Sequence, residues 1–188
     1  EHCHIIEKFH FLDAVAHGKP MHPCNATFED GYRVAVIADA MRRYCDTRSL
    51  KADLEELFAR MVFNILVSND DDHLRNHAFV WDASAGGWRL SPLYDVMPRA
   101  SLASERFLHL GIGDQGRLAH LDNAWSATER FGLLPLDAAR IIDRVWRVVR
   151  QWKQHFESIG VPAEQIERIA PAFRHLDEVS SPQLRRKL

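Results

Sequence analysis

The clearest repeating pattern in the chain lies between residues 54 and 66, where apolar positions recur at steps of three and four. This spacing predicts an α-helix, and the large number of apolar positions indicates that the helix lies in the core. Asp53, Glu55 and Glu56 are expected in its first turn, where acidic side chains suit the helix dipole. The pattern stops at Ser68, so the helix is expected to end there. Its apolar positions are Leu54, Leu57, Phe58, Met61, Val62, Ile65 and Leu66.

Two other stretches have helical spacing. Residues 32–44 place their apolar side chains on one side of a predicted helix, and Pro135 to Ile159 form a long amphipathic stretch. Gly160 is expected just beyond the end of this second helix, and Pro171 is expected to break the helix that follows.

Short strands are predicted at residues 79–81 and 88–90. Ala85-Gly86-Gly87 between them favours a hairpin turn. Residues 99–125 are expected to be mostly loop, and residues 126–129 form a potential helix-capping sequence. The predicted fold class is therefore mainly α with a small β-hairpin.

The composition argues against general nucleic-acid binding and against a membrane-spanning protein. The chain has 188 residues, of which 46% are hydrophobic and 27% charged, which is typical of one globular domain spanning residues 1–188. A formal charge of -2 gives no support for general nucleic-acid binding. No apolar run approaches the roughly 20 residues that a membrane span needs. Three cysteines without a CxxC pair favour reduced thiols and a cytoplasmic location.

An acidic sequence directly after the core helix carries the candidate chemistry. Asp71 precedes Asn76 by five positions, and Asp95 follows the predicted hairpin. Protein kinases present their catalytic base and two magnesium ligands in this order. Asp71 could orient a substrate hydroxyl, while Asn76 and Asp95 offer oxygen atoms to a magnesium ion.

The residues around Asp71 are expected to play supporting parts. Asp70 and Asp72 lack the five-residue step to an asparagine, so they are expected to cap the loop or face water. His73 is expected to shape the loop, with phosphate contact as the alternative. Arg75 and Arg99 are candidate cations that could offset the repulsion between the carboxylates.

These residues resemble the HipA family of serine/threonine kinases, the toxins of bacterial toxin–antitoxin pairs. The resemblance implies that Asp71 is the catalytic aspartate of a protein-kinase-like C-terminal lobe that uses ATP and magnesium. It implies that His73, Leu74, Arg75 and Asn76 border the nucleotide, and that Tyr94 and Asp95 complete the site. Implied partners are a protein with a target serine or threonine and an antitoxin of the HipB type, with DNA reached only through that antitoxin. The matching stretches are residues 63–79 and 88–98, with a weaker likeness from about residue 9 to residue 160.

Family members carry a β-rich N-terminal lobe with a lysine and a loop for the nucleotide phosphates. None of the lysines in this sequence lies in a convincing strand context for that task. Gly111-Ile112-Gly113 comes after the proposed metal aspartate, which is the wrong place for a phosphate loop. The sequence is therefore expected to lack the N-terminal β lobe, and to be folded but nearly inactive by itself.

Two alternative functions stay open at this point. The chain could be a truncated pseudokinase that binds an antitoxin or another partner. It could instead be a metal-dependent phosphohydrolase built on Asp70, Asp71, Asp72 and His73, which would need two metal ions and further ligands. A metal site at Glu1-His2-Cys3-His4 matches no zinc-binding spacing.

Overall fold

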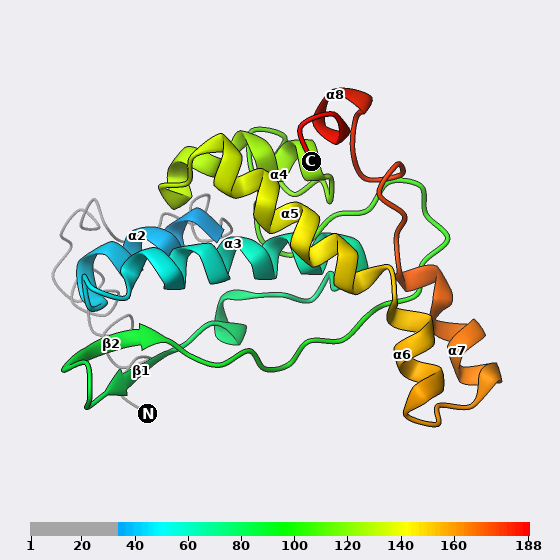
Figure 1. The fold of residues 1–188 in the computed structure, drawn as a ribbon, viewed down its shortest axis with the longest axis horizontal. Helices are drawn as coiled ribbons and strands as arrows, with labels where there is room; N and C mark the ends of the chain where they lie inside the picture. The colour runs from blue at the N-terminus through cyan, green and yellow to red at the C-terminus, as the bar shows by residue number, and fades with distance from the viewer. Residues whose placement is uncertain (1–33) are drawn as a thin grey trace, which may run out of the picture.

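The computed structural model describes residues 34–188, and helix α3, Leu50–Val67, runs through the middle of this region (Figure 1). The spacing of its apolar residues explains this position, because Leu57, Phe58 and Val62 are completely buried. The helix ends where the sequence pattern stops. Ser68 adopts a left-handed backbone with φ 54°, and its N–H donates a hydrogen bond to the carbonyl of Asn64.

Helices α2, Val34–Tyr44, and α5, Pro135–Val149, both pack against α3. Figure 1 shows α2 beside the first half of α3 and α5 crossing the same central helix. The 3₁₀ helix η3, Thr128–Phe131, brings Phe131 against Phe58 of α3, with ring centroids 5.3 Å apart in an edge-to-face arrangement. The core is therefore a helical layer built around α3, as the periodicity predicted.

The predicted hairpin is present as strands β1, Phe79–Asp82, and β2, Gly87–Leu90, which pair antiparallel. The turn between them needs a positive φ, which Gly86 supplies at 67°. Asp82 stabilises the turn because its carboxylate accepts the N–H of Ala85 at 3.1 Å. Within residues 34–188, the architecture is mainly helical with one two-stranded antiparallel sheet.

The acidic residues near the start of α3 do not act as the sequence suggested. The helix begins at Leu50, so only Asp53 falls in the first turn. Asp53 is 4% exposed and does not face solvent. Its carboxylate accepts hydrogen bonds from Arg89 Nη2 at 2.7 Å and from the Leu90 N–H at 3.2 Å. The residue therefore fastens the hairpin to α3.

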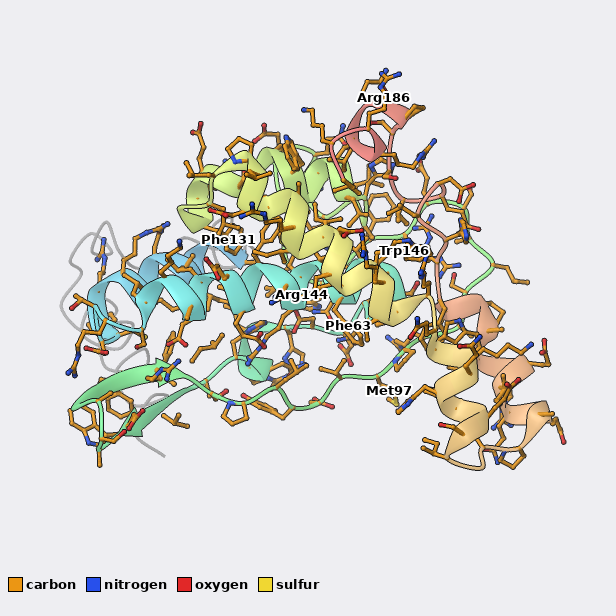
Figure 2. The ribbon with its side chains drawn as sticks, in the orientation of Figure 1. Phe63, Met97, Phe131, Arg144, Trp146 and Arg186 are labelled. Atoms are coloured by element: carbon orange, nitrogen blue, oxygen red, sulfur yellow. The ribbon has the colours of Figure 1, made fainter. Side chains whose placement is uncertain are left out.

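The long predicted helix over residues 135–159 was wrong as a single element. It consists of α5 and a separate helix α6, Trp152–Ser158, divided at Arg150 and Gln151. The apolar spacing continues across the break, but Trp152 in α6 stacks on Phe173, with ring centroids 4.0 Å apart. Figure 2 labels Trp146, which lies on α5 before the break.

After α6, a glycine and a proline end helical segments as the sequence predicted. Gly160 adopts φ 80° beyond the end of α6, and α7, Ala163–Ile169, follows. Pro171 lies in the short 3₁₀ helix η4, Ala170–Ala172, which ends this helical stretch. A final short helix, α8, spans Pro182–Arg185.

The region expected to be loop contains one helix, α4, at Leu121–Ser126. The predicted capping sequence at residues 126–129 was wrong, because Ser126 is the last residue of α4 and its hydroxyl donates to the carbonyl of Asn123 at 2.7 Å. Gly113 packs so closely against α4 that an added Cβ would lie 2.0 Å from the carbonyl oxygen of Asn123. This glycine therefore allows the close packing of the loop on α4.

Helix α4 is capped by a titratable residue. His120 Nδ1 accepts the N–H of Asp122 at 3.3 Å. Burial lowers the pKa of His120 below its ordinary value, with Arg174 acting in the same direction and Asp122 against it. The neutral imidazole is the form that can accept this hydrogen bond.

The His120 cap predicts a pH dependence of stability. The pKa of His120 is lower in the folded state than in the unfolded state, so its contribution is complete above about pH 6.5 and is lost as the pH falls below that value. Urea denaturation at about pH 7.5 and about pH 5.5 should show a lower midpoint at the acidic pH. In His120→Asn, whose side chain caps without titrating, the drop should be smaller. An equal drop in both proteins would contradict this role.

No helix within residues 34–188 has the length and apolar character required to cross a lipid bilayer. Cys3, Cys24 and the segment Glu1-His2-Cys3-His4 lie outside the described residues. Cys45 is buried at the end of α2, beside strand β2.

Candidate functional site

The end of α3 positions the acidic loop. Asn64, which lies in the last turns of the helix, donates a hydrogen bond through Nδ2 to Asp72 Oδ2 at 2.7 Å. Asn69 donates to Asn64 Oδ1 at 3.1 Å, and His77 Nε2 lies 3.0 Å from Asp72 Oδ1. Asp72 is 6% exposed, so the expectation that it could face water was wrong. The contacts of Asp72 and Asn64 connect both ends of the loop, at Asn69 and His77, to the core helix. We call this group of buried polar residues the Asp72 brace.

Asp71, the predicted base, is exposed beside this brace. Its backbone carbonyl accepts the N–H of His73 at 2.9 Å and the Asn76 Nδ2 at 3.2 Å. The second bond fixes the amide of Asn76, which is 5% exposed, and leaves its Oδ1 as the side-chain atom able to bind a cation. The five-residue spacing thus gives a closed turn that carries one carboxylate and one oriented amide.

The Tyr94-Asp95 segment lies directly beside this turn. Beyond the hairpin, residues 91–99 run back beside residues 70–78 in the opposite direction (Figure 1). One backbone hydrogen bond, from the Ser91 N–H to the Ala78 carbonyl at 2.8 Å, continues the contact next to the strands. Two side-chain hydrogen bonds join the segments farther along, from the Tyr94 hydroxyl to the Arg75 carbonyl at 2.7 Å and from Arg99 Nη1 to Asp70 Oδ1 at 2.8 Å.

Asp95 has a special backbone conformation at this point. Its φ is 54°, in the left-handed region that few residues other than glycine adopt. Aspartate tolerates this region better than most residues, and such outliers gather at functional sites. The side chain is exposed, and Tyr94 before it is held to the 3₁₀ helix η2, Leu74–Asn76. The conformation therefore belongs to a segment fixed by its neighbours.

Of the two candidate cations, Arg99 forms an ion pair with the acidic loop. The hydrogen bond and ion pair to Asp70 raise the pKa of Arg99 above its ordinary value, and the charge of Asp71 adds to this effect. Arg99 therefore stays positively charged next to the predicted base. Arg75 is exposed, and its backbone carbonyl, not its side chain, makes the contact with Tyr94.

His73 and Leu74 lie between the base and Asn76. Leu74 packs against the hydrophobic core and anchors η2 there. The ring of His73 meets the ring of His109 edge to face, with centroids 5.8 Å apart. Its Nδ1 is buried without a hydrogen-bond partner in the described part of the chain. No sequence signal linked His109 to His73, because the contact arises from the path of a long loop.

The donor set suits magnesium in chemical type. Magnesium prefers oxygen ligands from one or two carboxylates and completes its shell with water and substrate phosphates. Asp71 and Asp95 present exposed carboxylates and Asn76 an amide oxygen, on two adjacent segments. Within residues 34–188, no three His, Cys, Asp or Glu side chains gather to hold a metal ion. The described residues thus give no support to a two-metal phosphohydrolase centre.

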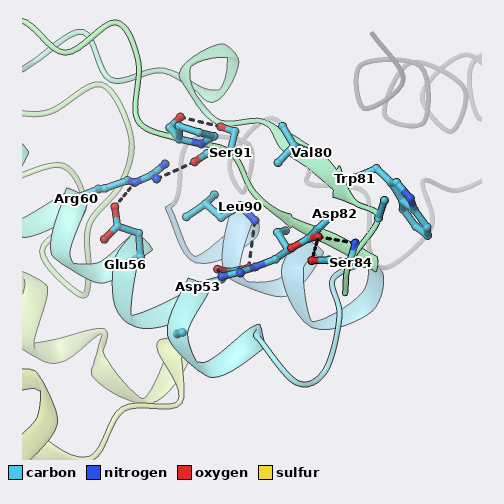
Figure 3. Close-up of a pocket in the computed structure, with 13 residues that line it drawn as sticks. Asp53, Glu56, Arg60, Val80, Trp81, Asp82, Ser84, Leu90 and Ser91 are labelled. Atoms are coloured by element: carbon cyan, nitrogen blue, oxygen red, sulfur yellow. Dashed lines mark hydrogen bonds and ion pairs between the residues drawn. The ribbon is translucent and has the colours of Figure 1, made fainter. Parts of the chain in front are cut away.

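A groove of about 680 Å³ lies between α3 and the hairpin (Figure 3). None of the predicted site residues lines it. Arg60 in its wall is 6% exposed, with Nε 2.9 Å from Glu56 Oε1 and Nη2 donating to the Ser91 carbonyl at 2.7 Å. This contact holds the chain just before Tyr94 and Asp95. Arg60 therefore helps to fix the segment that leads to Tyr94 and Asp95.

Sequence reasoning missed Asp53, Arg60 and Asn64 as positioning residues. Arg60 and Asn64 interrupt the apolar pattern of α3, Asp53 directly precedes it, and all three are buried. A polar side chain on the buried face of a helix must find a partner, since desolvation is otherwise costly. That signal was present in the sequence, although the partner of each residue was not.

Comparison with known proteins agrees with the sequence resemblance. No curated protein matches the chain. The family described as HipA-like C-terminal domain has a sequence model that matches residues 3–153. The match spans α2, α3, the acidic loop, the hairpin and α5, and so includes every residue of the site described above. The chain therefore belongs to the family of HipA-like C-terminal domains.

Proposed function

We propose that this chain is the C-terminal lobe of a HipA-like protein serine/threonine kinase, with residues 1–188 forming one domain. The lobe transfers a phosphoryl group from ATP to a protein hydroxyl when it is completed by an N-terminal nucleotide-binding lobe. The observation that carries the proposal is the side-by-side, antiparallel course of residues 70–79 and 90–99. It brings the segment of Asp71 and Asn76 beside the segment of Tyr94 and Asp95.

The residues of the loop have separate roles in this proposal. Asp71 accepts a hydrogen bond from the substrate hydroxyl and takes its proton during transfer. Asn76 and Asp95 hold the magnesium ion, which neutralises phosphate charge when bound. His73, Leu74, Arg75 and Tyr94 border the nucleotide, and the buried Asp72 brace keeps Asp71 in place. Phosphoryl transfer depends mostly on such positioning and charge stabilisation, so a rigid loop is the main requirement.

Manganese binding tests the shared cation site without relying on activity. Mn²⁺ replaces Mg²⁺ at oxygen sites and broadens nearby amide resonances in NMR spectra. We expect submillimolar Mn²⁺ in the presence of ATP to broaden Asp71, Asn76 and Asp95 first. Asp95→Asn should weaken the binding by about tenfold or more, since one charged ligand becomes neutral.

Asp70→Asn is the matched control for this experiment. It removes a carboxylate from the same loop, but Asp70 is already paired with Arg99. Broadening that persists in Asp95→Asn and disappears in Asp70→Asn would contradict the assignment. Nucleotide affinity of residues 1–188 alone should be weak, because the phosphate-covering loop and lysine belong to the other lobe. Micromolar ATP binding in calorimetry would count against a two-lobe requirement.

The proposed partners follow from the family. They are a protein with a target serine or threonine and an antitoxin of the HipB type, through which DNA is contacted, in the cytoplasm of a bacterium. A truncated pseudokinase that only binds a partner is the competing function. It predicts no ATP-dependent Mn²⁺ effect at Asp95, so the same titration separates the two.

A further inference from the structure

Two arginines meet at the C-terminal end of α3, where the acidic loop begins. The backbone N–H of Arg174 donates to the Leu66 carbonyl at 2.8 Å, and Arg174 is 7% exposed. Arg106 donates to the hydroxyl of Ser68, the residue that ends α3. Burial lowers the pKa of both arginines, and both interact electrostatically with a shared neighbour, Glu178.

Both arginines hold the loop that follows Asp95. Arg106 Nη2 donates to the Ser101 carbonyl at 2.6 Å, and its Nε to the Ala103 carbonyl at 3.2 Å. Arg174 Nη2 donates to the Ser104 carbonyl at 3.2 Å. The loop between these contacts is open to solvent, since Leu102 is 94% exposed. The arginines thus form the base under an accessible stretch from Ser101 to Ser104.

The negative charge around these arginines is small for two guanidinium groups. A helix C-terminus contributes only about half a negative charge. Among the described residues the carboxylate that acts on both is Glu178, whose side chain is 57% exposed. Its Oε2 lies 3.7 Å from Arg174 Nε, too far for a hydrogen bond. Arg174 Nε is buried and lacks a hydrogen-bond partner in the described part of the chain.

Ser104 lies at a position where a group with more negative charge than the Glu178 carboxylate could be attached. Its side chain is exposed, and its hydroxyl makes no hydrogen bond to any described residue. Its own carbonyl already touches Arg174 Nη2. A phosphoryl group carries about 1.5 to 2 negative charges and three acceptor oxygens. In place of the Glu178 carboxylate, it would bring the charge of the cluster close to balance.

We propose that Ser104 is a phosphorylation site whose phosphoryl group docks on Arg174, beside Arg106, and displaces Glu178. The modification forms a bond between Ser104 Oγ and the γ-phosphorus of ATP. The bond from that phosphorus to the β,γ-bridging oxygen breaks, ADP leaves, and the hydroxyl proton passes to a base or to water. Any protein serine kinase can supply the reaction, so the inference does not depend on the proposed function of this chain.

Docking would tighten the connection between the two halves of the site. The loop from Asp95 to Arg106 is fixed at one end by Arg99 on Asp70 and at the other by the arginine pair. An added charge-assisted contact at Ser104 orders the segment between these points. The phosphoryl group is therefore a regulatory element for the placement of Asp95.

The test uses residues 1–188 with phosphoserine incorporated at position 104 during synthesis. We expect the thermal midpoint to rise by about 2–4 °C over the unmodified protein at low salt. Phosphorus NMR should show the second pKa of the phosphoserine about one unit below its usual value near 6, because paired guanidinium groups favour the dianion. Arg174→Lys should abolish this pKa shift, since lysine keeps the charge but loses the planar fork.

Three controls accompany this measurement. Phosphoserine at Ser158, an exposed residue at the end of α6, tests for an effect of added charge alone. Glu178→Gln removes the competing carboxylate from an exposed position, so the pKa of phosphoserine 104 should fall further; this arm also serves if Arg174→Lys fails to fold. An ordinary pKa at position 104 would overturn the proposal. The proposal would also fail if inorganic phosphate shifted the Arg174 Nε resonance of the unmodified protein while phosphoserine 104 did not.

Discussion

Asp71→Asn is expected to reduce phosphoryl transfer by about 10²- to 10⁴-fold in a kinase assembled from this lobe and an N-terminal nucleotide-binding lobe. Asparagine has nearly the same shape, but its neutral amide cannot take the hydroxyl proton. The exposed side chain makes no contact that folding requires, and the loop is held by the Asp71 backbone carbonyl, which the substitution keeps. Transfer of radiolabelled phosphate from ATP to a protein acceptor measures the effect.

Asp70→Asn is the matched control for Asp71→Asn. Both residues are exposed aspartates in the same loop, but Asp70 is paired with Arg99, 2.8 Å away. The exposed ion pair contributes little to stability, typically below about 1 kcal/mol. We expect its loss to reduce transfer by less than about tenfold, through weaker positioning of Arg99. Equal losses in the two variants would remove the basis for choosing Asp71 as the base.

Asn64→Ala is expected to lower the free energy of unfolding by about 3 kcal/mol. The substitution removes the hydrogen bond to Asp72 at 2.7 Å and the bond from Asn69 at 3.1 Å. It leaves the carboxylate of Asp72, which is only 6% exposed, without one of its partners. Urea denaturation followed by circular dichroism measures the change.

A control variant and a double mutant separate the network from general damage to α3. Lys51→Gln alters an exposed side chain on the same helix and should change stability by less than about 0.5 kcal/mol. In Asn64→Ala/Asp72→Asn the buried charge is gone, so the combined loss should be smaller than the sum of the single losses by about 0.5–3 kcal/mol. Strict additivity would show that the two side chains do not act as a unit.

The parts of the fold that follow from local rules were predictable. The helix over residues 54–66, its end at Ser68 and the hairpin around Gly86 are all observed. These features depend on repeat spacing and on turn residues, which a sequence displays directly. The division at residues 150–151 was not visible, because Trp152 and Phe156 keep the apolar spacing while packing on Phe173.

In the candidate site, too, some features could be predicted from the sequence and others could not. Motif order singled out Asp71, Asn76 and Asp95, and their assignment as catalytic and metal-binding residues stays a prediction. Asp72 was expected to be a surface or capping residue because nothing in the sequence distinguishes the side chains of three adjacent aspartates. Burial distinguishes them, since Asp72 faces Asn64 and His77 whereas Asp70 and Asp71 are exposed.

The order of amino acids was enough to establish the helical class, the central helix, the hairpin and membership of the HipA-like C-terminal family. The folded chain was needed to show which polar residues brace the loop, that residues 70–79 and 90–99 lie side by side, and that Arg106 and Arg174 both hold the loop of residues 101–104. The difference comes from the range of the interactions involved. Periodicity and turn chemistry act between residues a few positions apart, whereas buried hydrogen bonds and ion pairs join residues that are distant in the sequence and meet only after folding.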